Sequence, residues 1–110
     1  MGQDGAVDLT PGMKLASTVC ATEVIVVRPP SGPVDVECGG AAMVAADEAP
    51  AEDARGALDE AHRDSTLLGK RYLHEDSGLE LLCTKPGAGS LAVGGVALPL
   101  KEAKPLPSSD

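Results

Sequence analysis

The side chains best suited to metal or thiol chemistry in this chain are three cysteines and two histidines: Cys20, Cys38, Cys83, His62 and His74. Cys20 and Cys38 lie at the two ends of one predicted hairpin, so their thiols could meet. A structural zinc or a rubredoxin-type iron is bound by four soft ligands, usually including one Cys-x-x-Cys pair. We therefore take Cys20 and Cys38 as candidate metal ligands, with Cys83 and His74 as candidate additional ligands.

Other interpretations of these residues stay open because the sequence contains no Cys-x-x-Cys pair. Cys20 and Cys38 could be free thiols or could form a disulfide. Cys83 falls in the middle of a predicted strand, where a cysteine usually acts as a small buried apolar side chain. His62 lies in an acidic segment, and either histidine could reach the two thiols only across the interface between the two halves of the chain. We expect no cofactor, with iron or zinc as the alternative.

Catalytic patterns are weak in this sequence. Glu23 and Glu80 occupy equivalent strand starts, which favours a shared structural role over acid–base catalysis. Cys83 precedes Thr84 and Lys85, but no cysteine–histidine pair supports a nucleophile there. The stretch from Gly87 to Ser90 lacks the Gly-Lys-Ser/Thr ending of a phosphate-binding loop, so it predicts a hairpin turn. The sequence favours a non-catalytic protein over an enzyme.

The elements that would position these residues form an internal repeat. Residues 22–36 align without a gap on residues 79–93, which pairs Glu23 with Glu80 and Gly32 with Gly89. Glu37 and Cys38 have no counterpart in the second copy, and Ser77 takes the place of Cys20. An internal repeat indicates the overall architecture of a chain before any single residue is interpreted. We predict repeat one over 12–44 and repeat two over 67–100, joined by an acidic connector over 45–66.

Each repeat is expected to be a β-hairpin unit. Turn residues and apolar runs predict strands over 13–19, 23–28, 34–37, 41–44, 69–76, 79–84, 90–93 and 96–100. The run from Val24 to Val27 is continuously apolar, which predicts burial on both faces. The fold class is therefore all-β, with two hairpin units related by pseudo-twofold symmetry. The connector is either a short exposed helix beginning near Pro50 or a flexible linker.

Composition limits the remaining possibilities. The chain has 110 residues, no Phe or Trp, one Tyr and a net charge of −8. It is long enough for one domain, over 11–100, with a core of aliphatic side chains. The negative charge argues against nucleic acid and anionic membranes as partners. The sequence shows no transmembrane or signal segment, so we expect a cytoplasmic protein with a flexible arm over 1–10 and an extended tail over 101–110.

The first repeat also has the pattern of a known family. Its sequence GMKLASTVCATEVIVV, a Gly-Pro turn and then VECGGAAMV resembles desulforedoxin and the N-terminal module of desulfoferrodoxin. These rubredoxin-like β-proteins hold one iron with four thiolates. The second loop cysteine of the family falls on Cys20 and its adjacent pair falls on Cys38 and Gly39, whereas its first cysteine falls on Ser17. The resemblance implies a tandem-duplicated module with an incomplete cysteine set.

Three hypotheses for function follow. The first is a small accessory or subunit-type protein that docks onto a larger enzyme partner through its sheet edges and the tail Glu102 to Asp110, or that associates with itself. The alternative is a desulforedoxin-like metal-binding or electron-transfer module that uses Cys20 and Cys38. The third is a thiol-dependent enzyme or redox sensor.

Overall fold

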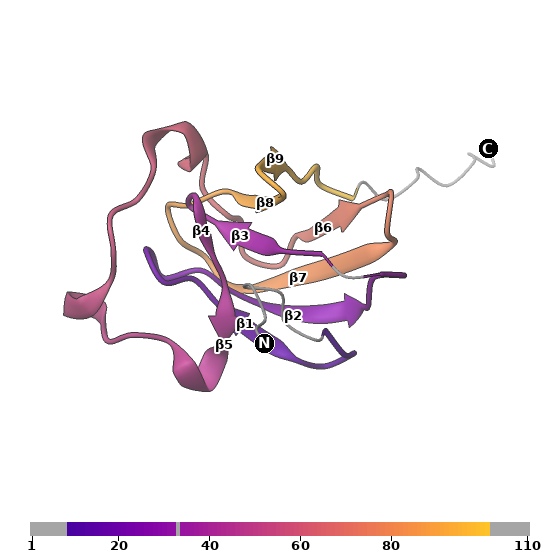
Figure 1. The fold of residues 1–110 in the computed structure, drawn as a ribbon, viewed down its shortest axis with the longest axis horizontal. Coiled ribbons are helices and arrows are strands. Elements are labelled where there is room, and N and C mark those ends of the chain that lie inside the picture. Colours follow the sequence, from indigo (N-terminus) through magenta and orange to yellow (C-terminus); the bar gives the residue numbers. More distant parts are fainter. Residues whose placement is uncertain (1–8, 33, 102–110) are drawn as a thin grey trace, which may run out of the picture.

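The computed structural model describes residues 9–32 and 34–101, and it folds them into two antiparallel sheets (Figure 1). The larger sheet has the order β5-β1-β2-β7-β6, with β1 at Lys14–Ala16, β2 at Glu23–Arg28, β5 at Val44–Ala45, β6 at Arg71–His74 and β7 at Leu79–Lys85. The smaller sheet has the order β4-β3-β8-β9, with β3 at Val36–Cys38, β4 at Ala41–Ala42, β8 at Leu91–Val93 and β9 at Val96–Ala97. The all-β prediction is confirmed.

The core lies between the two sheets and is aliphatic, as the composition predicts. Side chains from both sheets form one buried cluster, in which Tyr72 is the sole aromatic residue. Its most deeply buried leucines are Leu15, Leu79, Leu81 and Leu91. Because β2 pairs with β7 at the centre of the larger sheet, residues distant in sequence meet in this core.

Burial of β2 differs from the sequence prediction. Val24 and Val26 are buried, Ile25 is half-buried and Val27 is 39% exposed. The bounds of the strand match the prediction, but burial on both faces was wrong. Only one face of the larger sheet packs against the smaller sheet, so the run alternates as in other antiparallel sheets with one covered face.

Several predicted strands are shorter than their apolar runs. The first strand ends at Ala16 and not at residue 19, because Ser17 begins the loop that carries Cys20. The predicted strand over 41–44 is two strands, and they belong to different sheets: β4 pairs with β3, whereas β5 pairs with β1. Met43 lies between these strands and is buried. The chain therefore passes from one sheet to the other at this point.

The acidic connector is neither an α-helix nor an unattached linker. It contains three short 3₁₀ turns, at Ala46–Glu48, Glu52–Ala54 and Glu60–His62, and in Figure 1 it runs in pink around one end of the sheets. Its backbone binds the strand loops, since Gly56 N donates to Thr18 O at 2.9 Å and Asp59 N to Gly39 O at 3.0 Å. In the described part of the chain, no helix has the length and apolar character that a membrane crossing needs.

The terminal predictions lie mostly outside the described residues. Of the arm over 1–10, the structure describes Leu9 and Thr10, and Leu9 packs against the core. Of the tail over 101–110, it describes Lys101, so a docking role for Glu102 to Asp110 stays a prediction.

Glu80 fastens the segment after β9 to the larger sheet. Its carboxylate is 5% exposed and accepts hydrogen bonds from Lys101 Nζ at 3.0 Å and Arg71 Nη1 at 3.3 Å. Beside this ion pair, Leu73 N donates to Pro99 O and Lys101 N to Arg71 O. The hydrogen bond from Lys101, opposed by burial, holds the pKa of Glu80 below its ordinary value. The carboxylate therefore has a structural role, which Glu23 at the equivalent position does not repeat.

Replacing this carboxylate should remove stability in a pH-dependent way. A lowered folded-state pKa contributes stability above the pKa of the unfolded chain and loses it as the pH falls through the folded-state value. We expect Glu80→Gln to lower the free energy of unfolding by about 1–2 kcal/mol at neutral pH, and to differ less from wild type in acid. Urea unfolding at both pH values measures this, with the exposed Glu48→Gln as the control. An equal loss at both pH values would contradict the ionic role.

Candidate functional site

Cys20 and Cys38 lie together at one end of the two sheets. Cys20 is in the loop between β1 and β2, and Cys38 is the last residue of β3. Their Sγ atoms are 3.8 Å apart, and the residues are 8% and 0% exposed. Both are free thiols. The structure thus brings together the two cysteines that the sequence analysis selected, one from each sheet.

Two hydroxyl groups surround the Cys20 sulfur. Ser17 Oγ lies 3.4 Å from Cys20 Sγ, and Thr22 Oγ1 lies 3.2 Å from it. Ser17 Oγ also accepts hydrogen bonds from Val19 N and Cys20 N, both at 3.1 Å, which fixes the loop. With its oxygen already accepting two N–H groups, the Ser17 hydroxyl is free to donate its proton to a Cys20 thiolate.

The loop of residues 86–90, between β7 and β8, covers the two thiols. Gly89 N donates to Cys20 Sγ at 3.4 Å. A Cβ atom added at Gly87 would lie 2.5 Å from Thr22 N and 3.0 Å from Cys20 Sγ. One added at Gly89 would lie 2.8 Å from Gly39 Cα and 3.1 Å from Cys38 Sγ. Only glycine fits at these two positions, so the predicted hairpin turn also forms the cover of the site. We call residues 86–90 the glycine loop.

Residues of the connector bind the backbone of the glycine loop. Thr66 N donates to Gly87 O at 2.9 Å and Ser65 N to Ala88 O at 3.0 Å, and the Thr66 hydroxyl donates to Gly89 O. Ser90 N donates to His62 O at 2.8 Å. Thr66 Oγ1 also accepts a hydrogen bond from Thr22 Oγ1 at 3.2 Å, which joins the connector to the Cys20 loop. The site is therefore built by segments from the whole length of the domain.

The two thiols have different acidities. Burial raises the pKa of the Cys20 thiol, but hydrogen bonds with the Ser17 and Thr22 side chains and with the backbone N–H groups of Thr22 and Gly89 outweigh it, leaving the pKa at about 7. Burial, together with the charge of a Cys20 thiolate, raises the pKa of Cys38 to about 12. Near neutral pH the pair therefore combines a thiolate with a protonated thiol.

The structure does not bring the other candidate ligands to this pair. Cys83 Sγ contacts Lys85 O at 3.3 Å within β7. His74 pairs with Leu79, at the end of β7 opposite the glycine loop, and its Nδ1 lies 2.7 Å from Ser77 Oγ. Among the described residues, no group of three or more His, Cys, Asp or Glu side chains could hold a metal ion. The four soft ligands of a structural zinc or a rubredoxin-type iron are not assembled here.

Sequence reasoning missed several residues of this site, namely Thr22, Thr66, Gly87 and Gly89 as contacts of the thiols or of their cover. The alignment of Ser17 with a family cysteine was the one signal that placed a further residue at the site. Searches among protein families, curated proteins and solved structures find no match to this chain.

Proposed function

We propose that this protein is a thiol–disulfide redox module whose reactive group is the Cys20–Cys38 pair. The observation that supports this most is the 3.8 Å separation of two free, buried sulfur atoms. A disulfide needs a sulfur separation of about 2.05 Å, so rotation of the Cys20 and Cys38 side chains has to bring the two sulfur atoms about 1.8 Å closer. The site has the donors that stabilise a thiolate, but it lacks the ligands that a tetrahedral metal needs.

The acidities of the two thiols assign their roles. Cys20 is the nucleophile because its thiolate is populated near neutral pH, and Cys38 is the resolving thiol because it keeps its proton. Forming the Cys20–Cys38 disulfide from a thiolate and a thiol releases two electrons, which an oxidant must accept, and one proton. Two electrons from a reductant, with one proton, reverse the reaction.

Alkylation of Cys20 should titrate near pH 7. We expect the rate of its reaction with iodoacetamide to rise with pH and reach half its maximum at about pH 7, because the thiolate is the reactive form. Asp59 and His62 are titratable residues whose backbones bind the segments next to the thiols, at Gly39 and at Ser90. Asp59→Asn and His62→Gln variants measure whether either side chain contributes to the midpoint. Peptide mapping identifies the alkylated residue, with Cys83 as the internal comparison. A midpoint near that of an ordinary cysteine would contradict the assignment.

Disulfide formation provides the decisive test. Wild-type protein is incubated to completion with hydrogen peroxide and, in a parallel sample, with oxidised dithiothreitol; in at least one of the two it should lose two hydrogens in mass, and peptide mapping should locate the new bond between Cys20 and Cys38. The Cys38→Ala variant should show neither change. Protein that stays reduced in every buffer, while its unfolded form oxidises, would overturn the proposal.

We also infer that the two units of the chain are copies of one ancestral hairpin module. The strand order supports this inference, since β2 lies beside β7 and β3 lies beside β8, with the hairpin partner of each strand outside it. In that case Ser17 and Gly39 stand where a desulforedoxin-like ancestor carried thiolates, and the present pair is what is left of a metal site.

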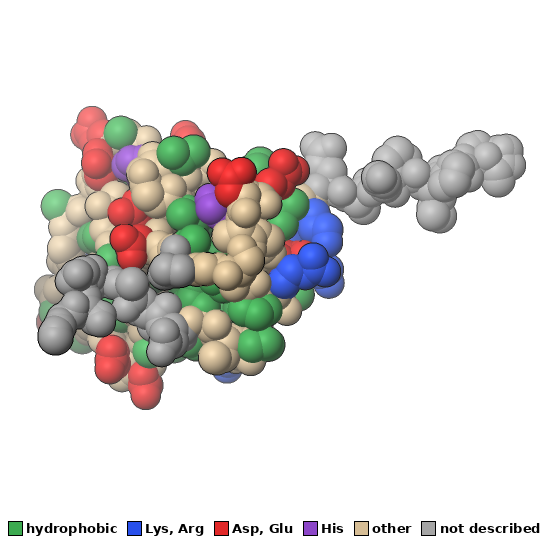
Figure 2. Space-filling view, turned by 45° about the vertical axis from the view of Figure 1, so that its right-hand side comes forward, with side chains coloured by type: hydrophobic (Ala, Val, Ile, Leu, Met, Phe, Trp, Pro, Cys, Tyr) green, Lys and Arg blue, Asp and Glu red, His purple; other side chains and the backbone are tan. Residues whose placement is uncertain are grey.

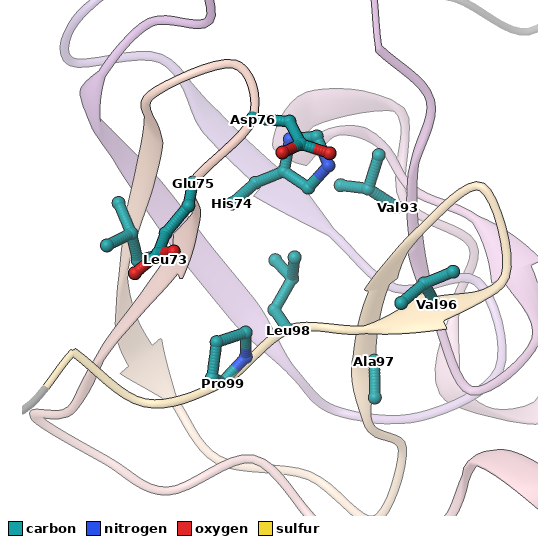
Figure 3. Close-up of a pocket in the computed structure, with 9 residues that line it drawn as sticks. All are labelled: Leu73, His74, Glu75, Asp76, Val93, Val96, Ala97, Leu98 and Pro99. Atoms are coloured by element: carbon teal, nitrogen blue, oxygen red, sulfur yellow. The ribbon is translucent and has the colours of Figure 1, made fainter.

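A second candidate function, docking onto a protein partner, is supported by apolar side chains exposed around β9. Val96 is 69% exposed, Leu67 is 47% exposed and Leu100 is 42% exposed, and Leu67 and Leu100 line a hollow together with Ala97 of β9. Next to Val96 is a cavity of about 330 Å³, lined by Leu73, His74, Glu75, Asp76, Val93, Val96, Ala97, Leu98 and Pro99 (Figure 3). Figure 2 shows how apolar side chains lie among acidic ones on one face of the molecule. Exposed apolar clusters of this kind mark interaction surfaces.

The docking candidate has its own test. Native mass spectrometry of protein isolated from its host should show added mass that Val96→Asp removes, because a buried aspartate disfavours an apolar interface. The exposed Val27→Asp, on β2, serves as the control substitution. A wild-type protein that is strictly a single chain would exclude this function.

A further inference from the structure

We propose that the oxidant of the Cys20–Cys38 pair is a small uncharged hydroperoxide, and that the glycine loop excludes bulkier disulfide oxidants. This inference rests on the redox function proposed above. A peroxide-reactive site and a site for thiol–disulfide exchange differ in the size of the group that the sulfur must accept.

Space at the sulfur atoms supports this selection. Exchange with a disulfide forms a mixed disulfide, which leaves half of the oxidant bonded to Cys20. The glycine loop lies so close that even a single carbon atom added at Gly87 would approach Cys20 Sγ to 3.0 Å. Oxidation by a hydroperoxide instead adds one oxygen atom to the sulfur. The step that adds the smallest group is the one that the covered site can accommodate.

The glycine loop is also held closed. Hydrogen bonds from Ser65, Thr66 and Ser90 tie it to the connector. Thr66 is 1% exposed and Ser90 is 7% exposed. A bulky oxidant would have to break several of these bonds before it reached Cys20, whereas a small molecule needs only a transient opening.

The chemical surroundings of Cys20 suit a neutral oxidant. The groups that touch its sulfur are the Ser17 and Thr22 hydroxyls, the Gly89 N–H group and the Cys38 thiol. None of them carries a fixed charge that would bind an ionic oxidant. Hydroxyl and amide donors can instead hydrogen-bond to the oxygen atoms of a hydroperoxide and stabilise the oxygen that leaves.

The reaction balances in two steps. The Cys20 thiolate attacks the nearer oxygen of the hydroperoxide, the O–O bond breaks, and Cys20 becomes a sulfenic acid while the leaving oxygen takes a proton as water or an alcohol. The Cys38 sulfur, giving up its proton, then attacks the Cys20 sulfur, forms the S–S bond and expels water. With hydrogen peroxide, two thiols and one peroxide thus yield one disulfide and two water molecules.

The test compares two oxidants on folded and unfolded protein. Rate constants for loss of the Cys20 thiol are measured with hydrogen peroxide and with oxidised glutathione, in buffer and in urea. We expect the ratio of the peroxide rate to the glutathione rate to be at least about tenfold higher in the folded protein, because unfolding removes the cover but keeps the thiols. An unchanged ratio, or one that favours glutathione in the folded protein, would overturn the selection by size.

The Cys38→Ala variant identifies the intermediate. With hydrogen peroxide it should gain one oxygen atom at Cys20 and then react with dimedone, which traps sulfenic acids, and it should form little adduct with oxidised glutathione. A prominent glutathione adduct and no trapped sulfenic acid would contradict the peroxide assignment while leaving the redox function intact. Failure of the proposed function itself is recognised separately, because wild-type protein would then form no Cys20–Cys38 disulfide with either oxidant.

Discussion

Gly89→Ala should lower the free energy of unfolding by about 2–3 kcal/mol, which is typical of overpacking a site that cannot relax. The added Cβ would lie 2.8 Å from both Cα and N of Gly39, and these are backbone atoms that no rotamer change can move. The glycine loop would have to shift away from the thiols. Urea unfolding followed by circular dichroism measures the change in stability.

The same substitution should change the chemistry of Cys20. Moving the loop removes the hydrogen bond from Gly89 N, which is one of the groups that lower the Cys20 pKa. The midpoint of Cys20 alkylation should therefore rise above its wild-type value, and the selection against oxidised glutathione should weaken. These two readouts separate a displaced cover from a general loss of stability.

Gly32→Ala is the matched control for this prediction. A Cβ added at Gly32 meets nothing within 4 Å, and its backbone is not in the left-handed region. Gly32 is also the residue that aligns with Gly89 when residues 22–36 are placed on residues 79–93. If both variants unfold like wild type, the close approach of the glycine loop to Gly39 is wrong.

The strands and the pairing of Cys20 with Cys38 followed from sequence signals, whereas the surroundings of the thiols did not. Four consecutive β-branched residues mark β2 because they favour extended backbone wherever they occur. Which of those residues is buried depends on what covers the sheet, so the exposure of Val27 could not be derived from the run itself. For the same reason, the division of 41–44 between two sheets follows from tertiary packing around Met43.

The cover of the thiols shows a second limit of sequence reasoning. Glycine at 87 and 89 is compatible with a turn, and a turn is what the pattern predicts. That these glycines are required by the closeness of Thr22 and Gly39 depends on the pairing of β2 with β7, which joins residues far apart in the chain. A pattern of residue types indicates where the backbone can turn, but it does not indicate which distant residues will pack against the turn.

The role of the acidic connector could not be predicted from its composition either. Its charge and Pro50 favour a short exposed helix, whereas Gly56 interrupts the apolar stripe and favours a linker. Neither interpretation places the connector against the turn of residues 86–90. In the structure its last residues, from His62 to Thr66, bind the glycine loop through backbone groups. Backbone hydrogen bonds carry no residue-type signature, so this role leaves no trace in the sequence.

Ser17→Cys should convert the thiol pair into a metal site. Ser17 Oγ lies 3.4 Å from Cys20 Sγ and its side chain is buried, so a sulfur atom at this position would join Cys20 and Cys38 as a third thiolate. Structural zinc sites with four ligands gain about 10–16 kcal/mol, or about 3 kcal/mol for each ligand, which is about a hundredfold in affinity. We therefore expect the variant to bind Zn²⁺ about a hundredfold more tightly than wild type.

Gly39 offers no equivalent route, which makes Ser17 the informative position. A Cβ at Gly39 would lie 2.5 Å from Leu58 Cδ1 and 2.6 Å from Val19 Cγ2, and the residue has a φ of +68°. A cysteine there would be strained by the positive φ, and the Leu58 and Val19 side chains would have to shift to make room for it. The Ser17→Cys substitution alone therefore measures how much a thiolate in the Cys20 loop adds to the zinc affinity.

Competition with a chromophoric chelator measures the zinc affinity of wild type, Ser17→Cys and the exposed control Ser31→Cys. The control adds a thiol without placing it near the pair, so it should bind zinc no better than wild type. If Ser17→Cys also matches wild type, residues 17, 20 and 38 do not converge as ligands, and the proposed descent from a metal-binding module loses its structural support. A gain confined to Ser17→Cys would mean that a thiolate at position 17 is enough to make the redox pair proposed here bind zinc.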